Sequence, residues 1–321
     1  MEFSAVFSHT LCKKWDRGDH EGTTLLWSGR VGKYFGVCPE SLCSTDTSLP
    51  KEKFENPIIS PLAFETAKKF RNIAYWRIRN IEEYKEWIYE LNGAVVGFDM
   101  CTGIYEAPNG LLPYPDKDEI IGGHAVLLVG YSEERRAFRF MNSWGKEWGD
   151  RGYGWMPYEY FEQNCIRQTW NPIRAFRGRV KILNREKIVV NKRKIIIVLK
   201  SYQSLVSRSR NLIIIEAYNR RNDLLGWIIF SLADLQVEVE DIFVPPDHRH
   251  KGFGSALVRK LFRIVRGYAV ERIVAYLNNE DIIYNGDVVA EKFMQKHGFV
   301  FTQKDVYPGC RGVFETDLPN K

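Results

Sequence analysis

The sequence predicts a two-domain protein of mixed structure, with an α+β first half and an α/β second half. Its 321 residues exceed the usual size of a single domain. Helical spacing and then alternating strand patterns fill the first half. In the second half, a strand, a glycine-containing turn and an amphipathic helix follow one another over 241–261. A hydrophobic content of 45% is sufficient for two packed cores.

Composition narrows the classes of protein to which this chain can belong. No apolar run is long enough to span a bilayer, and the first 16 residues lack the pattern of a signal peptide. We therefore expect a cytoplasmic protein without a membrane partner. Six cysteines without a CxxC pair do not indicate a disulfide framework. Cys38 and Cys43 are close enough to suggest a metal site or a disulfide, but we expect buried, reduced thiols and no metal.

The net charge of +6 fits an anionic cofactor. Basic clusters occur at 191–194, 208–210 and 249–251, and the first two are expected to be solvated. Nucleic acid is not an expected partner, because these clusters lack interleaved aromatic residues and a recognisable binding module.

Apolar spacing predicts the elements of the first half in order. The patterns indicate three helices and a glycine-bounded buried strand, over 2–14, 24–35, 81–91 and 93–98. An apolar strand then starts at His124, and its return strand over 138–141 leads directly into Asn142. We expect this hairpin to bring His124 and Asn142 side by side.

A histidine held by an asparagine oxygen has a fixed tautomer and ring orientation, as a thiol-activating base requires. Trp144 is placed to shield the His124–Asn142 hydrogen bond from water. The alternative is a structural histidine beside a buried, satisfied asparagine.

The letters around this pair carry a family resemblance. HAVLLVGY and NSWGKEWGDRGYGWM resemble the His- and Asn-bearing strands of the papain-like cysteine peptidases, and GKYFGVCPES at 32–41 resembles the stretch leading to their cleft. The resemblance covers residues 3–172. It implies a papain-like fold, a helical part plus an antiparallel β part, and we assign this domain to 1–174.

One part of the family's pattern is missing. No glutamine–cysteine motif matches the nucleophile and its oxyanion partner, and Cys12 lies mid-helix before two lysines. The remaining cysteines match no nucleophile position either, and without a thiolate the histidine has no acyl-transfer chemistry. We therefore predict a pseudo-peptidase in which His124 and Asn142 are a vestigial pair, with a groove that could retain peptide-like ligands.

The second half reads as a series of strands and two helices. Strand-sized runs lie at 180–183, 188–190, 195–199, 212–218, 226–232, 237–244, 272–277, 299–302 and 311–315. The segment 219–223 is a hairpin turn. A helix over 288–297 ends at Gly298, a usual residue after a helix C-terminus.

The turn after the strand 237–244 has the composition of an anion site. Pro245 and Pro246 end the strand, because proline donates no hydrogen bond to a ladder. Gly252 and Gly254 let the backbone approach a ligand, and the helix that follows directs its positive end at that point. Such a turn suits a phosphate or pyrophosphate, although the same sequence is also compatible with an ordinary strand–helix connection.

This order of elements resembles the GNAT family of N-acetyltransferases over residues 178–318. The turn Arg249-xx-Gly252-x-Gly254 with its flanks PDHR and SALV matches the family's pyrophosphate signature, and Ala290, Phe293 and Gly298 match a second motif. We assign a GNAT domain, a mixed β-sheet flanked by helices, to 175–321. The resemblance implies acetyl-CoA or another acyl-CoA as cofactor. The cofactor-binding residues implied are Phe243, Val244, Arg249, His250, Lys251, Gly252, Phe253, Gly254, Ser255 and Asn285.

The same resemblance suggests catalytic residues. Glu240, beside the cofactor strand, is the candidate base and Glu238 the alternate, although both also fit a charged strand face. The family's usual tyrosine acid is Met294 here, so Tyr284 is the candidate acid. The connection 201–211 is too short for the helix pair that usually lines the acceptor, so the peptidase-like domain is a candidate for part of that wall.

We therefore predict an acetyl-CoA-dependent N-acyltransferase that acts on an amine of a small molecule or a peptide. Two alternatives stay open. One is a non-catalytic protein that binds CoA or peptide. The other is a cysteine peptidase-like protein whose nucleophile is truncated or supplied by a partner.

Overall fold

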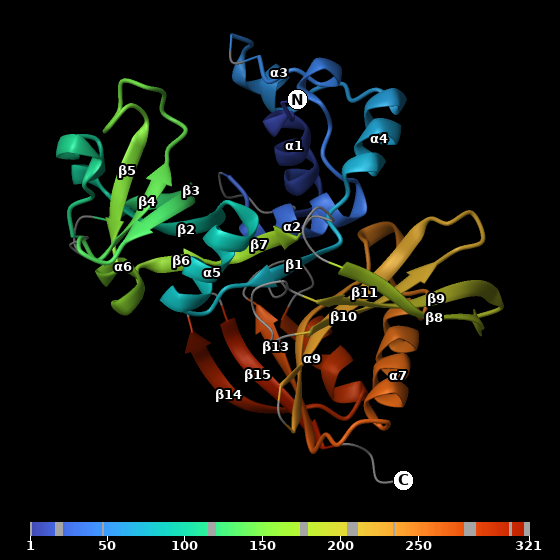
Figure 1. Cartoon of the computed structure of the whole chain (residues 1–321). Coiled ribbons are helices and arrows are strands. Elements are labelled where there is room, and N and C mark those ends of the chain that lie inside the picture. The colour runs from blue at the N-terminus through green and yellow to red at the C-terminus, as the bar shows by residue number, and fades with distance from the viewer. Residues whose placement is uncertain are drawn as a thin grey trace. The chain divides into compact units, whose positions relative to one another are not determined.

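The computed structural model describes most of the chain (Figure 1). The described residues are 2–16, 22–46, 48–114, 120–173, 179–203, 211–233, 235–278, 287–307 and 310–317. They fall into two compact units, Met1–Thr23 with Arg30–Ala74 and Ile173–Lys321, and Thr24–Gly29 with Tyr75–Pro172. The domain boundary at 174 stays a prediction, because the first unit combines N-terminal helices with the C-terminal half. No helix among the described residues is both long and apolar enough to cross a membrane.

The second unit is built on a five-stranded antiparallel sheet in the order β5-β4-β3-β2-β6. Its elements are α5 (Ile81–Leu91), β2 (Ala94–Cys101), β3 (Ile120–Ser132), β4 (Ala137–Met141), β5 (Tyr153–Pro157), α6 (Glu159–Glu162) and β6 (Ile166–Gln168). Asn80 caps α5 by accepting the Glu83 N–H at 2.9 Å, and Asn92 ends it with a φ of 60°. The predicted α5 and the predicted β3–β4 hairpin are both present.

The N-terminal segment of the chain is helical, and it contributes to both units, because residues 24–29 belong to the second unit. Its elements are α1 (Ala5–Asp16), α2 (Leu25–Tyr34), α3 (Lys51–Glu55) and α4 (Pro61–Ala67), and β1 (Ala74–Arg77) pairs with β7 (Trp170–Ile173) in a two-stranded sheet. The predicted helices α1 and α2 are confirmed. No pattern predicted α3 and α4, because five and seven residues are too few to show a helical period.

The C-terminal half forms an eight-stranded sheet in the order β14-β15-β13-β12-β11-β10-β9-β8. Its strands are β8 (Arg179–Val190), β9 (Arg193–Gln203), β10 (Asn211–Tyr218), β11 (Leu224–Ala233), β12 (Gln236–Phe243), β13 (Arg272–Asn278), β14 (Val300–Tyr307) and β15 (Cys310–Asp317). β12 and β13 run parallel, and the other neighbours are antiparallel. The runs 180–183 and 188–190 are one strand rather than two pieces, with a bulge after Ile182.

Helix α7 (Phe253–Val265) covers one face of this sheet, and α9 (Asp287–Lys296) contributes to the same core (Figure 1). The core side chains are apolar and mostly inaccessible, among them Ile215, Ile228, Val239, Leu257 and Leu261. Because α7 follows β12 directly, the strand–turn–helix predicted from the sequence is also the packing unit of this face. The predicted two-part fold, papain-like and then GNAT-like, is confirmed.

Candidate functional site

The turn between β12 and α7 has the backbone of an anion-binding loop. A short 3₁₀ helix (Pro246–His248) follows β12, and then His250 and Gly252 adopt φ values of 57° and 84°. Gly252 is the N-cap of α7, and it has no side chain that could cap the helix. Consecutive N–H groups in such a turn form a concave donor surface at the positive end of the helix. The turn thus contains two left-handed residues, and its role as a pyrophosphate site stays a prediction.

The glycines of the turn are required for different reasons. A Cβ on Gly254 would lie 3.2 Å from the Phe293 ring, so this glycine allows α7 and α9 to approach closely. A Cβ on Gly252 would lie 2.9 Å from Asn191 Nδ2. A side chain at Gly252 would therefore meet the β8–β9 turn, and the left-handed backbone there disfavours any non-glycine residue.

Several predicted cofactor residues serve the turn itself. Arg249 donates from Nε to the Val244 carbonyl at 3.0 Å, and its guanidinium lies 5.7 Å from the Phe243 ring centroid. Phe253 is buried in the core at 3% exposure. Ser255 Oγ lies 3.0 Å from Nε2 of His297. These side chains shape the loop, which leaves backbone amides as the main groups for an anion.

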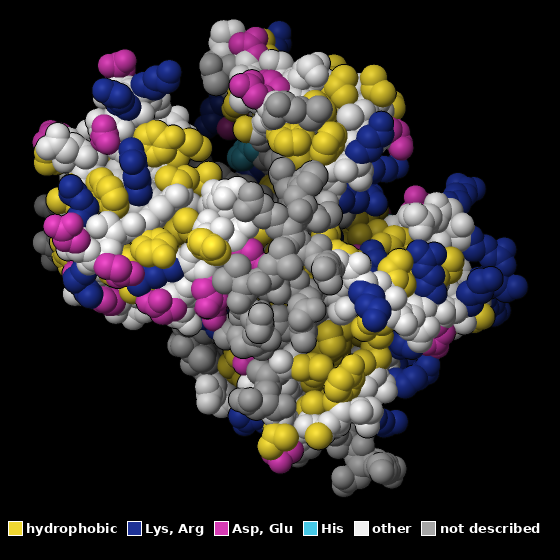
Figure 2. Space-filling view, in the orientation of Figure 1, with side chains coloured by type: hydrophobic (Ala, Val, Ile, Leu, Met, Phe, Trp, Pro, Cys, Tyr) yellow, Lys and Arg dark blue, Asp and Glu magenta, His cyan; other side chains and the backbone are white. Residues whose placement is uncertain are grey.

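Positive charge surrounds the turn. The β8–β9 hairpin touches it, because Asn191 Nδ2 donates to the Lys251 carbonyl at 3.0 Å. Figure 2 shows Lys and Arg side chains gathered over this edge of the sheet. The exposed basic residues of the hairpin include Lys187, Lys192, Arg193 and Lys194. An anionic ligand bound at the turn would be electrostatically favoured.

The end of β12 parts from β13. Their pairing runs from Gln236↔Arg272 to Val239↔Ala275, whereas β12 continues to Phe243 along β11. Glu240 is the extra residue of a bulge at this point.

The two predicted base candidates lie on this part of β12. Glu240 is fully buried, at 0% exposure. It lies at the bulge where β12 and β13 separate. Glu238 is half-buried and accepts a hydrogen bond from Gln236 Nε2 at 3.0 Å. Tyr284 and Asn285 lie outside the described residues.

Helix α2 contacts the same region, which the sequence reasoning missed. Arg30 forms a two-point ion pair with Asp241, with Nη2–Oδ1 at 2.6 Å and Nε–Oδ2 at 3.2 Å. Tyr34 Oη lies 3.2 Å from Nε2 of His248 in the turn. The only available signal was the presence of two cations, Arg30 and Lys33, in an otherwise largely apolar helix.

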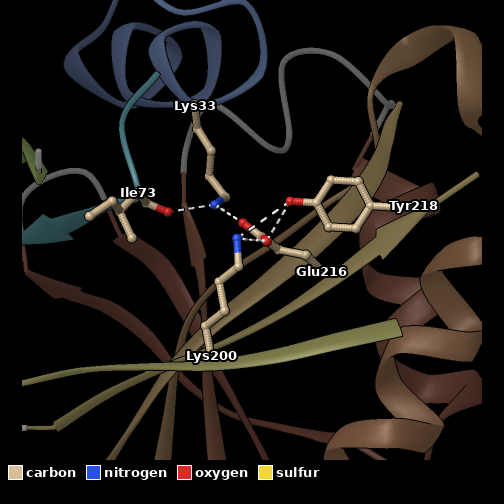
Figure 3. A network of polar contacts seen from close by, with 5 residues as sticks. All are labelled: Lys33, Ile73, Lys200, Glu216 and Tyr218. Carbon is tan, nitrogen blue, oxygen red and sulfur yellow. Dashed lines mark hydrogen bonds and ion pairs between the residues drawn. The ribbon is translucent and has the colours of Figure 1, made fainter. Parts of the chain in front are cut away.

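A second buried charge network lies under α2 (Figure 3). Lys33 and Lys200 each place Nζ 2.5 Å from a different oxygen of Glu216, and Tyr218 donates to Glu216 at 2.7 Å. Lys33 also donates to the Ile73 carbonyl at 2.5 Å. Burial alone raises the pKa of Glu216, but the two lysines together outweigh it and bring that pKa to about 2. Glu216 is therefore an ionised, saturated structural group rather than a free base.

The predicted His124–Asn142 pair is present in the second unit. Nε2 of His124 lies 2.9 Å from Oδ1 of Asn142, and the Ser143 N–H donates to the same oxygen at 2.8 Å. Because this oxygen only accepts, Nε2 of His124 is the donor, and in the neutral ring the lone pair is then on Nδ1. The Trp144 ring centroid lies 4.8 Å from that of the His124 ring, so Trp144 is next to the pair, and its shielding role stays a prediction.

The cysteines of the described residues are buried. The contacts of His124 include Phe98, Asn142 and Trp144. Cys12, Cys38, Cys43, Cys101 and Cys165 are all buried, and no disulfide joins them. Burial raises the pKa of the Cys12 thiol to about 12, so it is protonated at neutral pH.

Comparison with known families agrees with the two halves. Residues 182–299 match the model of the acetyltransferase (GNAT) family, and residues 53–170 match that of the papain family cysteine proteases. The two matches lie in separate segments of the chain, the papain family first and the GNAT family second. The papain match begins later than the resemblance at residue 3 that the sequence suggested.

Individual relatives cover the papain-family and GNAT domains separately. An uncharacterized peptidase C1-like protein of Acanthamoeba polyphaga mimivirus is 32% identical over 154 residues, which are 44% of this chain and 48% of the viral protein. Xylellain, a cysteine protease from Xylella fastidiosa, is 28% identical over 53% of this chain and 69% of its own, with a TM-score of 0.46. The PaiA N-acetyltransferase of Thermoplasma acidophilum, solved with coenzyme A, is 18% identical over 33% of this chain and 60% of its own, with a TM-score of 0.28.

Proposed function

We propose that the GNAT domain transfers an acetyl group from acetyl-CoA to a primary amine. The observation that supports this most directly is the left-handed turn at His250 and Gly252, beside the point where β12 parts from β13. A pyrophosphate on the turn amides and a pantetheine arm along the open edge of β12 would place a thioester close to Glu240. A GNAT family match that includes both features supports the same assignment.

The roles of the residues follow from their positions. Bound acetyl-CoA supplies an activated acetyl group as a thioester. The backbone of Phe243 and Val244 orients the pantetheine arm, and Glu240 accepts the proton of the attacking ammonium, directly or through water. The C–N bond then forms as the C–S bond breaks, and the thiolate that leaves takes up a proton. Tyr284 remains the candidate donor for that proton, and Glu238 the alternate base.

We further propose that the papain-family domain does not hydrolyse peptides in this chain. Hydrolysis by a His–Asn pair requires a thiolate on the free Nδ1 side. The described cysteines are buried, and burial raises the pKa of the Cys12 and Cys38 thiols above its ordinary value. In this proposal the domain binds or positions the acceptor, and its helices support the acetyltransferase.

A charge variant of the turn tests the cofactor assignment. Gly252→Glu forces a side chain into a left-handed position against the β8–β9 turn and adds a negative charge beside the amides that would hold the pyrophosphate. We expect acetyl-CoA affinity in calorimetry to fall more than about tenfold, or about 1.4 kcal/mol. Gly267→Glu is the matched control, because Gly267 is exposed just beyond the opposite end of α7.

The control should keep wild-type affinity. Equal binding by the wild type and Gly252→Glu would refute the site. Acetyl-CoA turnover with a panel of amines then tests the reaction, and Glu240→Gln should lower it by about 10²–10⁴-fold if Glu240 is the base. Turnover that survives this change would reassign the base.

A further inference from the structure

We propose that Arg30, on helix α2 of the N-terminal segment, is a positioning residue of the acetyltransferase. Its ion pair with Asp241 holds the last residues of β12 where their backbone can orient the pantetheine arm. This inference rests on the proposed function, because it concerns how the same site holds acetyl-CoA. It assigns a role in the acetyltransferase to a helix that precedes the papain-family match.

The ion pair is fully enclosed. The Arg30 and Asp241 side chains are 1% and 2% exposed, and both carboxylate oxygens are engaged by the guanidinium. The Arg30 guanidinium also lies 4.6 Å from the centroid of the Phe243 ring, two residues further along β12. A planar fork that holds a carboxylate at two points fixes orientation as well as distance.

The held segment lies beyond the pairing of β12 with β13. Before the bulge, β12 lies between β11 and β13, and from Asp241 to Phe243 the ladder among the described residues is with β11. Packing on the face of β12 contributes to the position of this segment. Phe243 packs against Trp15 of α1 at 5.5 Å and against Trp227 at 5.0 Å.

Helix α2 also reaches the turn that follows. Tyr34, one turn after Arg30, contacts Nε2 of His248, and burial, followed by the charge of Lys251, lowers the pKa of His248. A neutral His248 whose Nε2 is unprotonated accepts a hydrogen bond from the Tyr34 hydroxyl. One helix thus contacts both the cofactor strand and the cofactor turn.

The connection between β9 and β10 is short. β9 ends at Gln203 and β10 begins at Asn211, so only 204–210 lie between them. The family's helix pair, expected at this connection, does not fit in that length. Lys33 of α2 binds Glu216 on the same face of the sheet. Helix α2 therefore lies over a part of the sheet near this short connection, where the family's helix pair is not available.

An apolar double variant separates positioning from stability. In Arg30→Met/Asp241→Leu, both buried charges are replaced together by apolar groups of similar size, a change that is often neutral for stability. The matched control is Lys33→Met/Glu216→Gln, which alters a buried ion pair of the same helix on a different strand. Calorimetry with each protein uses acetyl-CoA and adenosine 3′-phosphate 5′-diphosphate, which contains the pyrophosphate but lacks the pantetheine arm.

We expect the Arg30/Asp241 variant to bind acetyl-CoA about tenfold more weakly and the truncated ligand within about twofold of the wild type. The control should bind both ligands like the wild type. A folded Arg30/Asp241 variant with wild-type affinity for acetyl-CoA would overturn the inference, as would an equal loss for both ligands. If that variant fails to fold, Arg30→Lys decides, since it keeps the charge but loses the fork and should show a smaller loss confined to acetyl-CoA. A wild type that does not bind acetyl-CoA would instead refute the proposed function.

Discussion

The two faces of the eight-stranded sheet are covered in different ways. The face under α7 is apolar, with side chains such as Ile228, Val239 and Leu257 that are almost inaccessible. The face that α2 contacts contains buried charges, with Glu216 bound to Lys33 and Asp241 bound to Arg30. Both faces are buried, but by different kinds of interaction.

The difference between the two faces concerns how specifically each face selects the helix that packs on it. Burial of apolar area is strong but non-directional, so it does not fix which helix lies where. A buried ion pair gains little over a well-packed apolar pair, because removing two charges from water is costly. It nevertheless requires one partner in one orientation. The α7 face follows from chain connectivity, whereas the α2 face relies on matched charges to define its partner.

Removal of Glu216 should have the largest effect on stability. Glu216→Ala leaves the buried Lys33 without its anion, so the free energy of unfolding should fall by about 3–5 kcal/mol. Urea unfolding followed by tryptophan fluorescence measures this loss, because Trp227 is buried on the same face. A loss below about 1 kcal/mol would show that the network is not coupled to folding.

The same variant predicts a pH dependence. The pKa of Glu216 is about 2 in the folded state, below its ordinary 4.5, so its stabilising effect is complete above pH 4.5 and disappears as the pH falls towards 2. The difference between the wild type and Glu216→Ala should therefore narrow between pH 5 and pH 2.

A cavity on the opposite face should cost somewhat less. Leu257→Ala removes a fully buried side chain from the core under α7, and we expect a loss of about 3 kcal/mol. Because no charge is involved, the loss should be the same at pH 5 and at pH 3. A pH-dependent loss would contradict the division of the two faces into apolar and charged.

The partly exposed pair beside α7 should matter least. Glu186 of β8 contacts Lys260 and lies 2.9 Å from Arg263, and the Glu186 and Arg263 side chains are 28% and 66% exposed. Arg263→Ala leaves Glu186 in contact with Lys260, so it should cost no more than about 1 kcal/mol, and less at high salt. A loss as large as that of Glu216→Ala would mean that exposure does not decide the strength of these pairs.

Several features were predictable because the information for them is local. His124 and Asn142 are 18 residues apart on neighbouring strands, and a hairpin with recognisable strand patterns brings them together. The strand, the turn at Gly252 and helix α7 are consecutive, so their order and their contact follow from the sequence. The roles of Arg249 and Ser255 were less predictable, because their side chains turn towards the protein's own Val244 and His297.

The sequence by itself determined the two halves, many of their longer helices and strands, and the two local motifs. Only the tertiary structure decided that helix α1 and the second half of α2, from Arg30 onward, belong to the same compact unit as the C-terminal sheet. Arg30 and Asp241 are 211 residues apart, and Lys33 and Glu216 are 183 apart. A cation on a helix shows no periodicity that identifies its distant partner, since that pairing depends on how the elements pack. The turn at Gly252 could be predicted from the sequence, but helix α2, which contacts the preceding strand β12, could not be assigned to that position.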